Sequence, residues 1–103
     1  MDLQLSGKHV LITGASMGIG AYLAKTFAAE NAHLHLTARS TEKLAALKAQ
    51  ITANHPVEVT LYASDLARPG ACEALSEAVG SVDILVNNAG AIPSGSLWDV
   101  DEE

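Results

Sequence analysis

Residues 10–20 read Val10-Leu11-Ile12-Thr13-Gly14-Ala15-Ser16-Met17-Gly18-Ile19-Gly20, an apolar run followed at once by a cluster of glycines. The apolar run predicts a buried strand, and the glycines predict a turn after it. Beyond the turn, Ile19, Leu23 and Phe27 recur at four-residue spacing, which predicts the buried face of a helix that ends near Asn31. The order is therefore strand, glycine loop, helix.

Three further apolar segments, all after the first predicted helix, predict strands. The segments over 34–38 and 57–63 alternate apolar with other residues, and the segment over 82–86 is apolar apart from Asp83. Two helices are predicted between them. Ser40 suits the N-cap of the first, which ends before Pro56 and has an apolar face made of Leu44, Leu47 and Ile51.

The second of these helices is predicted between Pro69 and Gly80. Proline suits the first turn of a helix and glycine its end, and Leu75 and Val79 supply the apolar face. The whole order is βαβαβαβ, which predicts an α/β fold: a parallel sheet with helices on both faces, in three layers. A chain of 103 residues has room for one such domain and one core, so residues 1–103 are expected to form a single domain.

Composition excludes several classes of protein. A formal net charge of −6 argues against a general nucleic-acid binder, which needs a basic face. The lone cysteine, Cys72, cannot form an internal disulfide, and Met1-Asp2-Leu3-Gln4 lacks the basic start of a secretory leader. The apolar runs are far too short to span a membrane. We therefore expect a cytoplasmic protein with no membrane segment.

The glycine loop has the chemistry of an anion site. Glycine allows the main chain to approach a ligand closely, and the following helix presents free N–H groups and the positive end of its dipole. A dinucleotide pyrophosphate is the natural ligand. About twenty residues on, the end of the second strand discriminates between cofactors: an acidic residue favours NAD and an arginine favours NADP. The sequence has Arg39 there, followed by Ser40, which favours NADP(H) over NAD(H).

Three motifs in order, each after a predicted strand, resemble the short-chain dehydrogenase/reductase family. They are Thr13-Gly14-x-x-x-Gly18-x-Gly20, Ser64-Asp65-Leu66 and Asn87-Asn88-Ala89-Gly90. The resemblance covers nearly the whole chain, and it implies a Rossmann-type sheet with strand order 3-2-1-4 that is incomplete.

The resemblance also implies which residues bind the cofactor. The loop would surround the pyrophosphate through Gly14, Ser16, Met17, Gly18, Ile19 and Gly20. Arg39 and Ser40 would contact the 2′-phosphate, and Asp65 and Leu66 would bind the adenine. Asn87, Ala89 and Gly90 would steady the central sheet and border the nicotinamide ribose. Met17 stands where many NADP-using relatives have a second basic residue, so Arg39 would act alone.

The catalytic group of that family is not found in the sequence. It rests on a Tyr-x-x-x-Lys pair with an upstream serine, in which the lysine lowers the pKa of the tyrosine. Four residues after Tyr22 stands Thr26, and four residues after Tyr62 stands Leu66, so neither tyrosine makes the pair. The usual positions would fall beyond Glu103. We therefore predict no catalytic residue in this chain, and no activity from it alone.

Three functions remain open on this basis. The first is a truncated oxidoreductase whose full-length form would interconvert alcohols and carbonyls. The second is a free-standing dinucleotide-binding regulatory module, and the third is one half of a split enzyme. Asp99-Val100-Asp101-Glu102 resembles a capping box and fits either a further helix start or a frayed acidic terminus. Together with the unprotected edge of strand 82–86, a helix start here favours truncation.

Two surface features of the predicted sheet concern its edge and its histidines. Strand 82–86 would form an uncovered apolar edge, so we expect the isolated chain to be marginally stable or to associate with itself or a partner chain there. His33 and His35 share a strand face, but a pair alone indicates a polar surface more than a zinc site, and no metal site is predicted.

Overall fold

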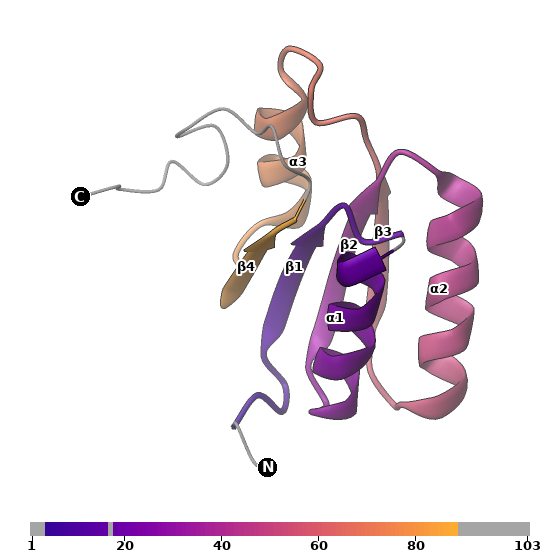
Figure 1. Ribbon diagram of the computed structural model, residues 1–103. Coiled ribbons are helices and arrows are strands. Elements are labelled where there is room, and N and C mark those ends of the chain that lie inside the picture. Colours follow the sequence, from indigo (N-terminus) through magenta and orange to yellow (C-terminus); the bar gives the residue numbers. More distant parts are fainter. Residues whose placement is uncertain (1–3, 17, 89–103) are drawn as a thin grey trace.

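The computed structural model describes residues 4–16 and 18–88, and seven elements follow one another in the predicted order (Figure 1). The four strands and three helices are β1 His9–Thr13, α1 Gly18–Ala29, β2 His33–Ala38, α2 Thr41–Asn54, β3 Val59–Ala63, α3 Ala71–Val79 and β4 Ile84–Asn87.

The four strands are parallel and lie in the order β3-β2-β1-β4, so the predicted sheet is confirmed. In register, Thr13 of β1 pairs with Thr37 of β2 and with Asn87 of β4. The carboxyl ends of all four strands therefore meet at one edge of the sheet, at the top of Figure 1. This is the edge where ligands bind in open α/β sheets.

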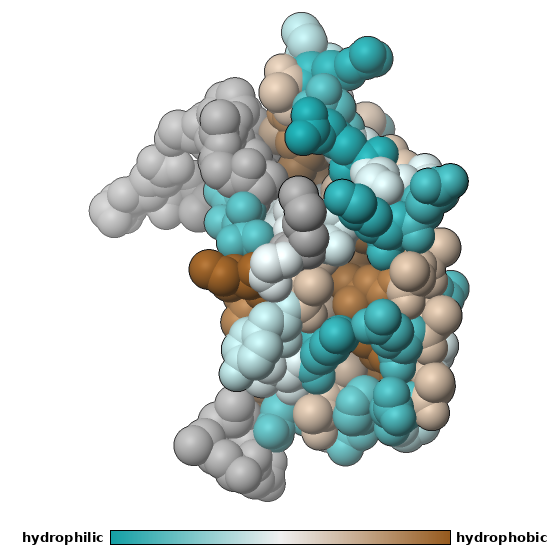
Figure 2. Space-filling view, turned by 45° about the vertical axis from the view of Figure 1, so that its right-hand side comes forward, coloured by the Kyte–Doolittle hydropathy of each residue, from teal (hydrophilic) through white to brown (hydrophobic). Residues whose placement is uncertain are grey.

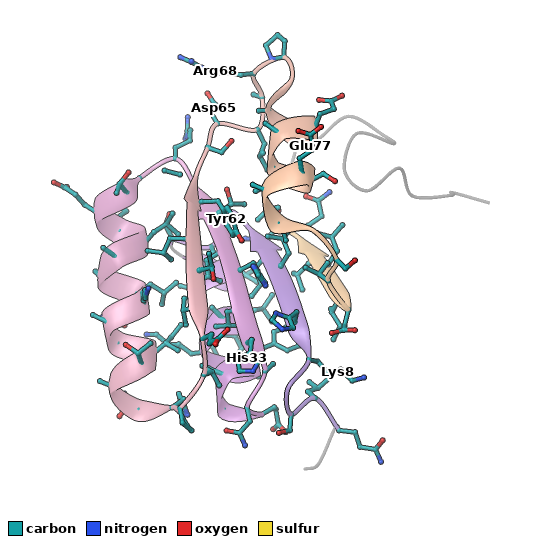
Figure 3. All side chains as sticks on the ribbon, turned by 180° about the vertical axis from the view of Figure 1, so that it is seen from behind. Lys8, His33, Tyr62, Asp65, Arg68 and Glu77 are labelled. Atoms are coloured by element: carbon teal, nitrogen blue, oxygen red, sulfur yellow. The ribbon has the colours of Figure 1, made fainter. Side chains whose placement is uncertain are left out.

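Helices cover both faces of the sheet, as the three-layer prediction requires. α1 and α2 lie on one face, over the larger core cluster, to which the inward side chains of β1, β2 and β3 contribute. α3 lies on the opposite face, where Cys72 and Leu75 pack with Leu11 of β1 and, at the margin, Leu85 of β4. Figure 3 looks onto this second face and shows that α3 leaves much of β2 and β3 uncovered.

The apolar face predicted for α1 is only partly right, because Leu23 and Phe27 pack at the margin of the larger core cluster and the fully buried residues lie one position further on. The residues of α1 that are buried are Gly20, Ala24 and Ala28, whereas Ile19 is 68% exposed and Leu23 and Phe27 are only partly buried. Both sets of residues recur every four positions, so the size of their side chains decides which set faces the sheet. Because small side chains allow the helix to pack closely against the sheet, the glycine–alanine face turns inward and the larger residues lie beside it.

The helix caps agree with the sequence, and several boundaries do not. Ser40 caps α2, since its Oγ accepts the Lys43 N–H at 3.2 Å, and Gly80 ends α3 at φ 78°. Pro69, however, precedes α3 instead of standing in its first turn, because Gly70 takes the N-cap position. Strand pairing also begins two residues later than predicted in β3 and β4, although Val57 is buried.

The outer surface of the α1–α2 side is mostly polar, with small apolar patches between the polar groups (Figure 2). Among residues 4–16 and 18–88, no helix is long and apolar enough to cross a membrane. The capping-box segment 99–102 lies outside the described residues.

Candidate cofactor site at the carboxyl edge of the sheet

The glycine loop joins β1 to α1 at this edge. Gly14 and Gly18 have φ values of 64° and 63°, in the left-handed region where a side chain is strained. Between them, Ala15 is fully buried, and its N–H donates to the Thr37 carbonyl of β2 at 3.1 Å. The loop is thereby tied across the top of β1 and β2, and the first turn of α1 begins directly after it.

Gly20 is required for a different reason, which is close packing. A Cβ on this residue would lie well inside contact distance of the Gly14 carbonyl oxygen, 2.9 Å from Asn88 Nδ2 and 3.0 Å from Ala15 Cα. The first turn of α1 therefore packs directly on the loop and on the end of β4. The main chain around this point is held in a tight, preformed shape.

A hydrogen-bond network joins the loop to β4. The buried Thr13 hydroxyl contacts Asn87 Oδ1 at 3.2 Å and the Val86 carbonyl at 3.4 Å, and it accepts the Asn88 N–H at 2.8 Å. Asn88 Nδ2 donates to the Gly14 carbonyl at 3.3 Å. The amide of Asn88, and not that of Asn87, thus reaches the glycine loop.

Thr13 and Asn88 were absent from the predicted site residues, although both stand inside the quoted motifs. A signal was available for Thr13: a hydroxyl at the end of a buried strand needs a partner there. Its register partner Thr37 behaves similarly, donating its Oγ1–H to the Tyr62 carbonyl of β3 at 2.6 Å. The side chains of two buried threonines therefore join β1 to β4 and β2 to β3 at their upper ends.

Arg39 lies one residue beyond β2 at the same edge. It is exposed, and its guanidinium has no hydrogen-bond or ion-pair partner among the described residues. The next residue is the cap of α2, so Arg39 stands directly before a helix N-terminus. A cation and the positive end of a helix dipole together favour a bound anion.

Asp65 follows β3, also at this edge, and Figure 3 shows it above the strands near Arg68. Its Oδ1 accepts the Ala67 N–H at 3.1 Å, which closes a local turn. Among the described residues no partner is found for Oδ2, so one carboxylate oxygen remains available for a ligand. Leu66 beside it is buried and packs with α3.

The fold therefore brings the ends of all four strands, with the predicted site residues that they carry, to one edge. Met17, Ala89 and Gly90, which belong to the same prediction, lie outside the described residues. The two tyrosines lie elsewhere: Tyr22 is 69% exposed on α1, and Tyr62 lies on the sheet face away from α1 and α2. No group of three or more metal-ligating side chains is found in ranges 4–16 and 18–88.

Comparison with known proteins agrees with this geometry. The family model for short chain dehydrogenase matches residues 8–103. An uncharacterised oxidoreductase of Mycobacterium tuberculosis is 38% identical over 101 residues, and D-xylose 1-dehydrogenase of Caulobacter vibrioides is 37% identical over 102 residues. These alignments cover 88% and 92% of this chain, but only 40% and 41% of the relatives.

Solved structures give the same result. L-sorbose reductase of Gluconobacter frateurii, complexed with NADPH and L-sorbose, superposes with a TM-score of 0.82 at 42% identity and covers 88% of this chain and 36% of that one. A metagenomic short-chain oxidoreductase in complex with NADP has a TM-score of 0.78 at 42% identity, over 84% of this chain and 41% of that one. The glycine loop, the strand order and the matches along the sequence lead to one conclusion: the chain belongs to the short-chain dehydrogenase family.

Proposed function

We propose that this chain is the NADP(H)-binding portion of an oxidoreductase that interconverts alcohol and carbonyl groups. The reductases and dehydrogenases that it resembles support the reaction class, and the chain spans about two fifths of their length. Residues 1–103 would form one dinucleotide-binding half-domain, and the groups that act on the substrate would come from outside it. The chain then binds and orients the cofactor, and the cofactor supplies the hydride chemistry.

The observation that carries the cofactor preference is Arg39 at the end of β2, which is exposed and has no partner among residues 4–16 and 18–88. The residues present fit a dinucleotide: the loop leads from β1 into the N-terminus of α1, a position that favours a bound pyrophosphate, and Asp65 keeps one oxygen for the adenine amino group. Solved relatives bound to NADPH or NADP support the same cofactor. Ser16, Gly18 and Ile19 would line the pyrophosphate.

Arg39→Ala should weaken NADPH binding by about 10- to 100-fold, since a hydrogen bond to a charged group contributes about 1.5–3 kcal/mol. NADH lacks the 2′-phosphate, so its affinity should change by less than about threefold. Calorimetric titration of the purified chain with each cofactor measures both quantities. Lys48→Ala is the matched control, because it removes one exposed positive charge from α2 away from the site.

Two results would contradict the proposal. Equal loss of NADPH and NADH affinity in Arg39→Ala would show that the arginine does not recognise the 2′-phosphate. Failure of the well-folded wild-type chain to bind either cofactor would remove the binding function itself. Circular dichroism on the same samples separates loss of binding from loss of folding.

The edge of β4 is the proposed contact with a second chain. β4 pairs only with β1, so its outer edge has no strand partner in the described part of the chain, and Ile84, Leu85 and Val86 are only partly buried. Unpaired apolar edges add strands readily. Light scattering should therefore detect association that increases with protein concentration. The midpoint temperature of thermal unfolding should rise with concentration in the same samples. A strictly monomeric sample with a sharp transition would contradict this expectation.

A further inference from the structure

Three histidines and a tyrosine form a polar cluster on the sheet face opposite α1 and α2. His9 comes from β1, His33 and His35 from β2, and Tyr62 from β3. His9 lies beside His33 in register, and its ring centroid is 5.1 Å from that of His33 and 5.2 Å from that of His35. Figure 3 looks onto this face and labels His33 and Tyr62, with α3 to one side. The cluster takes no part in the proposed cofactor site.

Two hydrogen bonds connect part of this cluster into a chain across three strands. His9 Nδ1 lies 3.0 Å from His35 Nε2, and His35 Nδ1 lies 2.9 Å from the Tyr62 hydroxyl. Both ring nitrogens of His35 are therefore engaged. His33 stands apart from the chain, since its Nδ1 accepts the Glu58 N–H at 3.0 Å. It adds a third imidazole close to His9 without joining the hydrogen bonds.

The number of protons that this chain can hold is limited. A neutral imidazole has one donor and one acceptor, so one proton lies between His9 and His35 and one between His35 and Tyr62. If Tyr62 donates to His35, then His35 donates to His9. If His9 Nδ1 gains a proton, it can donate to His35 Nε2, provided that the His35 proton moves to Nδ1 and points at the Tyr62 oxygen. If His35 is then protonated as well, its Nε2–H faces the Nδ1–H of His9, and the hydrogen bond between the two histidines breaks.

We propose that the His9–His35–Tyr62 chain is an acid-sensitive device that holds β1, β2 and β3 together at neutral pH and opens when both histidines are protonated. The groups around it are few. Glu58 lies just before β3. Asp83 lies just before β4, and its Oδ2 accepts the His9 backbone N–H at 2.8 Å. From α3, apolar side chains pack with Tyr62 in the smaller hydrophobic cluster. Among the described residues, no group of three or more ligating side chains is placed to hold a metal ion.

The electrostatics act in the same direction as the geometry. Burial, and then the nearby His9, lower the pKa of His35 below its ordinary value of 6.5, with a smaller opposing effect from Glu58 and a further lowering effect from His33. Burial raises the pKa of Tyr62, which keeps the phenol protonated as a donor. The unfolded chain therefore binds a proton on His35 at a higher pH than the folded chain does. Stability should be greatest above about pH 6.5 and should fall as the pH decreases through this value towards the folded pKa.

The test is urea unfolding of the full chain at about pH 7.5, 6.5 and 5.5. Between about pH 7.5 and 5.5 the folding equilibrium constant of the wild type should fall by more than about threefold and by at most about tenfold, because the unfolded chain takes up a proton that burial and His9 disfavour on folded His35. In His35→Gln, which cannot be protonated, the fall should be below about threefold on the same basis. His55→Gln is the control, because His55 ends α2 and has no ring contact with the cluster. Equal pH dependence in wild type and His35→Gln would overturn the proposal.

A second measurement holds even if His35→Gln does not fold. Nitrogen-detected NMR of the wild-type imidazoles reports tautomer and protonation directly. At neutral pH His35 should be neutral and should hold one tautomer, fixed by its hydrogen bonds to His9 and Tyr62, and it should lose this tautomer as the pH falls. Averaged tautomers of His35 at neutral pH would contradict the proposal. Shifts of these signals on adding Zn²⁺ at neutral pH would also overturn it, because the cluster would then be a metal site.

Discussion

Gly20→Ala should abolish detectable NADPH binding and destabilise the fold by about 3 kcal/mol, the upper end of the usual cost of overpacking. At an unhindered helix position the same change would stabilise by about 0.8–1 kcal/mol, because alanine is the better helix former. Here the new methyl group would meet the Gly14 carbonyl oxygen, which is backbone and cannot rotate away. The loop and the first turn of α1 must separate, and this movement displaces the groups proposed to bind the pyrophosphate.

Two variants make the result specific, each measured by urea unfolding and cofactor titration. Gly18→Ala introduces a side chain at positive φ but into open space, so it should cost about 1 kcal/mol of strain. Asn88→Ala removes the 3.3 Å bond to Gly14 without adding atoms, and should also cost about 1 kcal/mol. If Gly20→Ala were as stable as Gly18→Ala, the close approach of α1 to the loop would be refuted.

Leu36→Ala should remove the cooperative unfolding transition of the isolated chain. Leu36 is fully buried at the centre of β2, between its register partners Ile12 and Leu61. Truncating a buried leucine costs about 2–5 kcal/mol through lost burial and the cavity that remains. Domains are stable by only about 5–15 kcal/mol, and this one has an unpaired edge strand. Urea titration followed by circular dichroism measures the loss.

Ile19→Ala is the matched control, since it removes a similar number of apolar atoms from a side chain that is 68% exposed. It should cost less than about 0.5 kcal/mol, the usual range for surface substitutions. If Ile19→Ala instead cost as much as Leu36→Ala, the observed orientation of α1 would be wrong, and Ile19 would lie on the buried face of the helix.

Much of the architecture could be predicted because local patterns and topology agree. Short apolar runs separated by helical segments allow few arrangements other than a parallel sheet, and Ser40 and Gly80 act within one turn of their own positions. The strand order came from the resemblance to a family, since nothing in the periodicity distinguishes 3-2-1-4 from other orders. The residues predicted to bind the cofactor were placed at one edge by the strand–loop–helix pattern and by the same resemblance.

Apart from the boundaries of β3, β4 and α3, the errors and omissions concern contacts between distant segments. The choice between the Ile19 and Gly20 faces of α1 depends on how closely the helix packs on the sheet, which is a property of the core and not of the helix sequence. The role of Asn88 depends on β4 lying beside β1. Only this arrangement brings Asn88 to the Gly14 carbonyl, which is 74 residues away along the chain. The link from His9 to His35 and Tyr62 likewise requires three strands in register.

The amino-acid sequence thus contains the elements, their caps and the motifs that suggest a ligand, because these depend on periodicity and on residues close together along the chain. Only the tertiary structure decides which side chains become partners across the sheet. Strand register and the distance between the helices and the sheet are set by the packing of the whole core. Thr13 shows both levels: its motif could be read directly, but its bonds to the end of β4 exist only in the folded sheet.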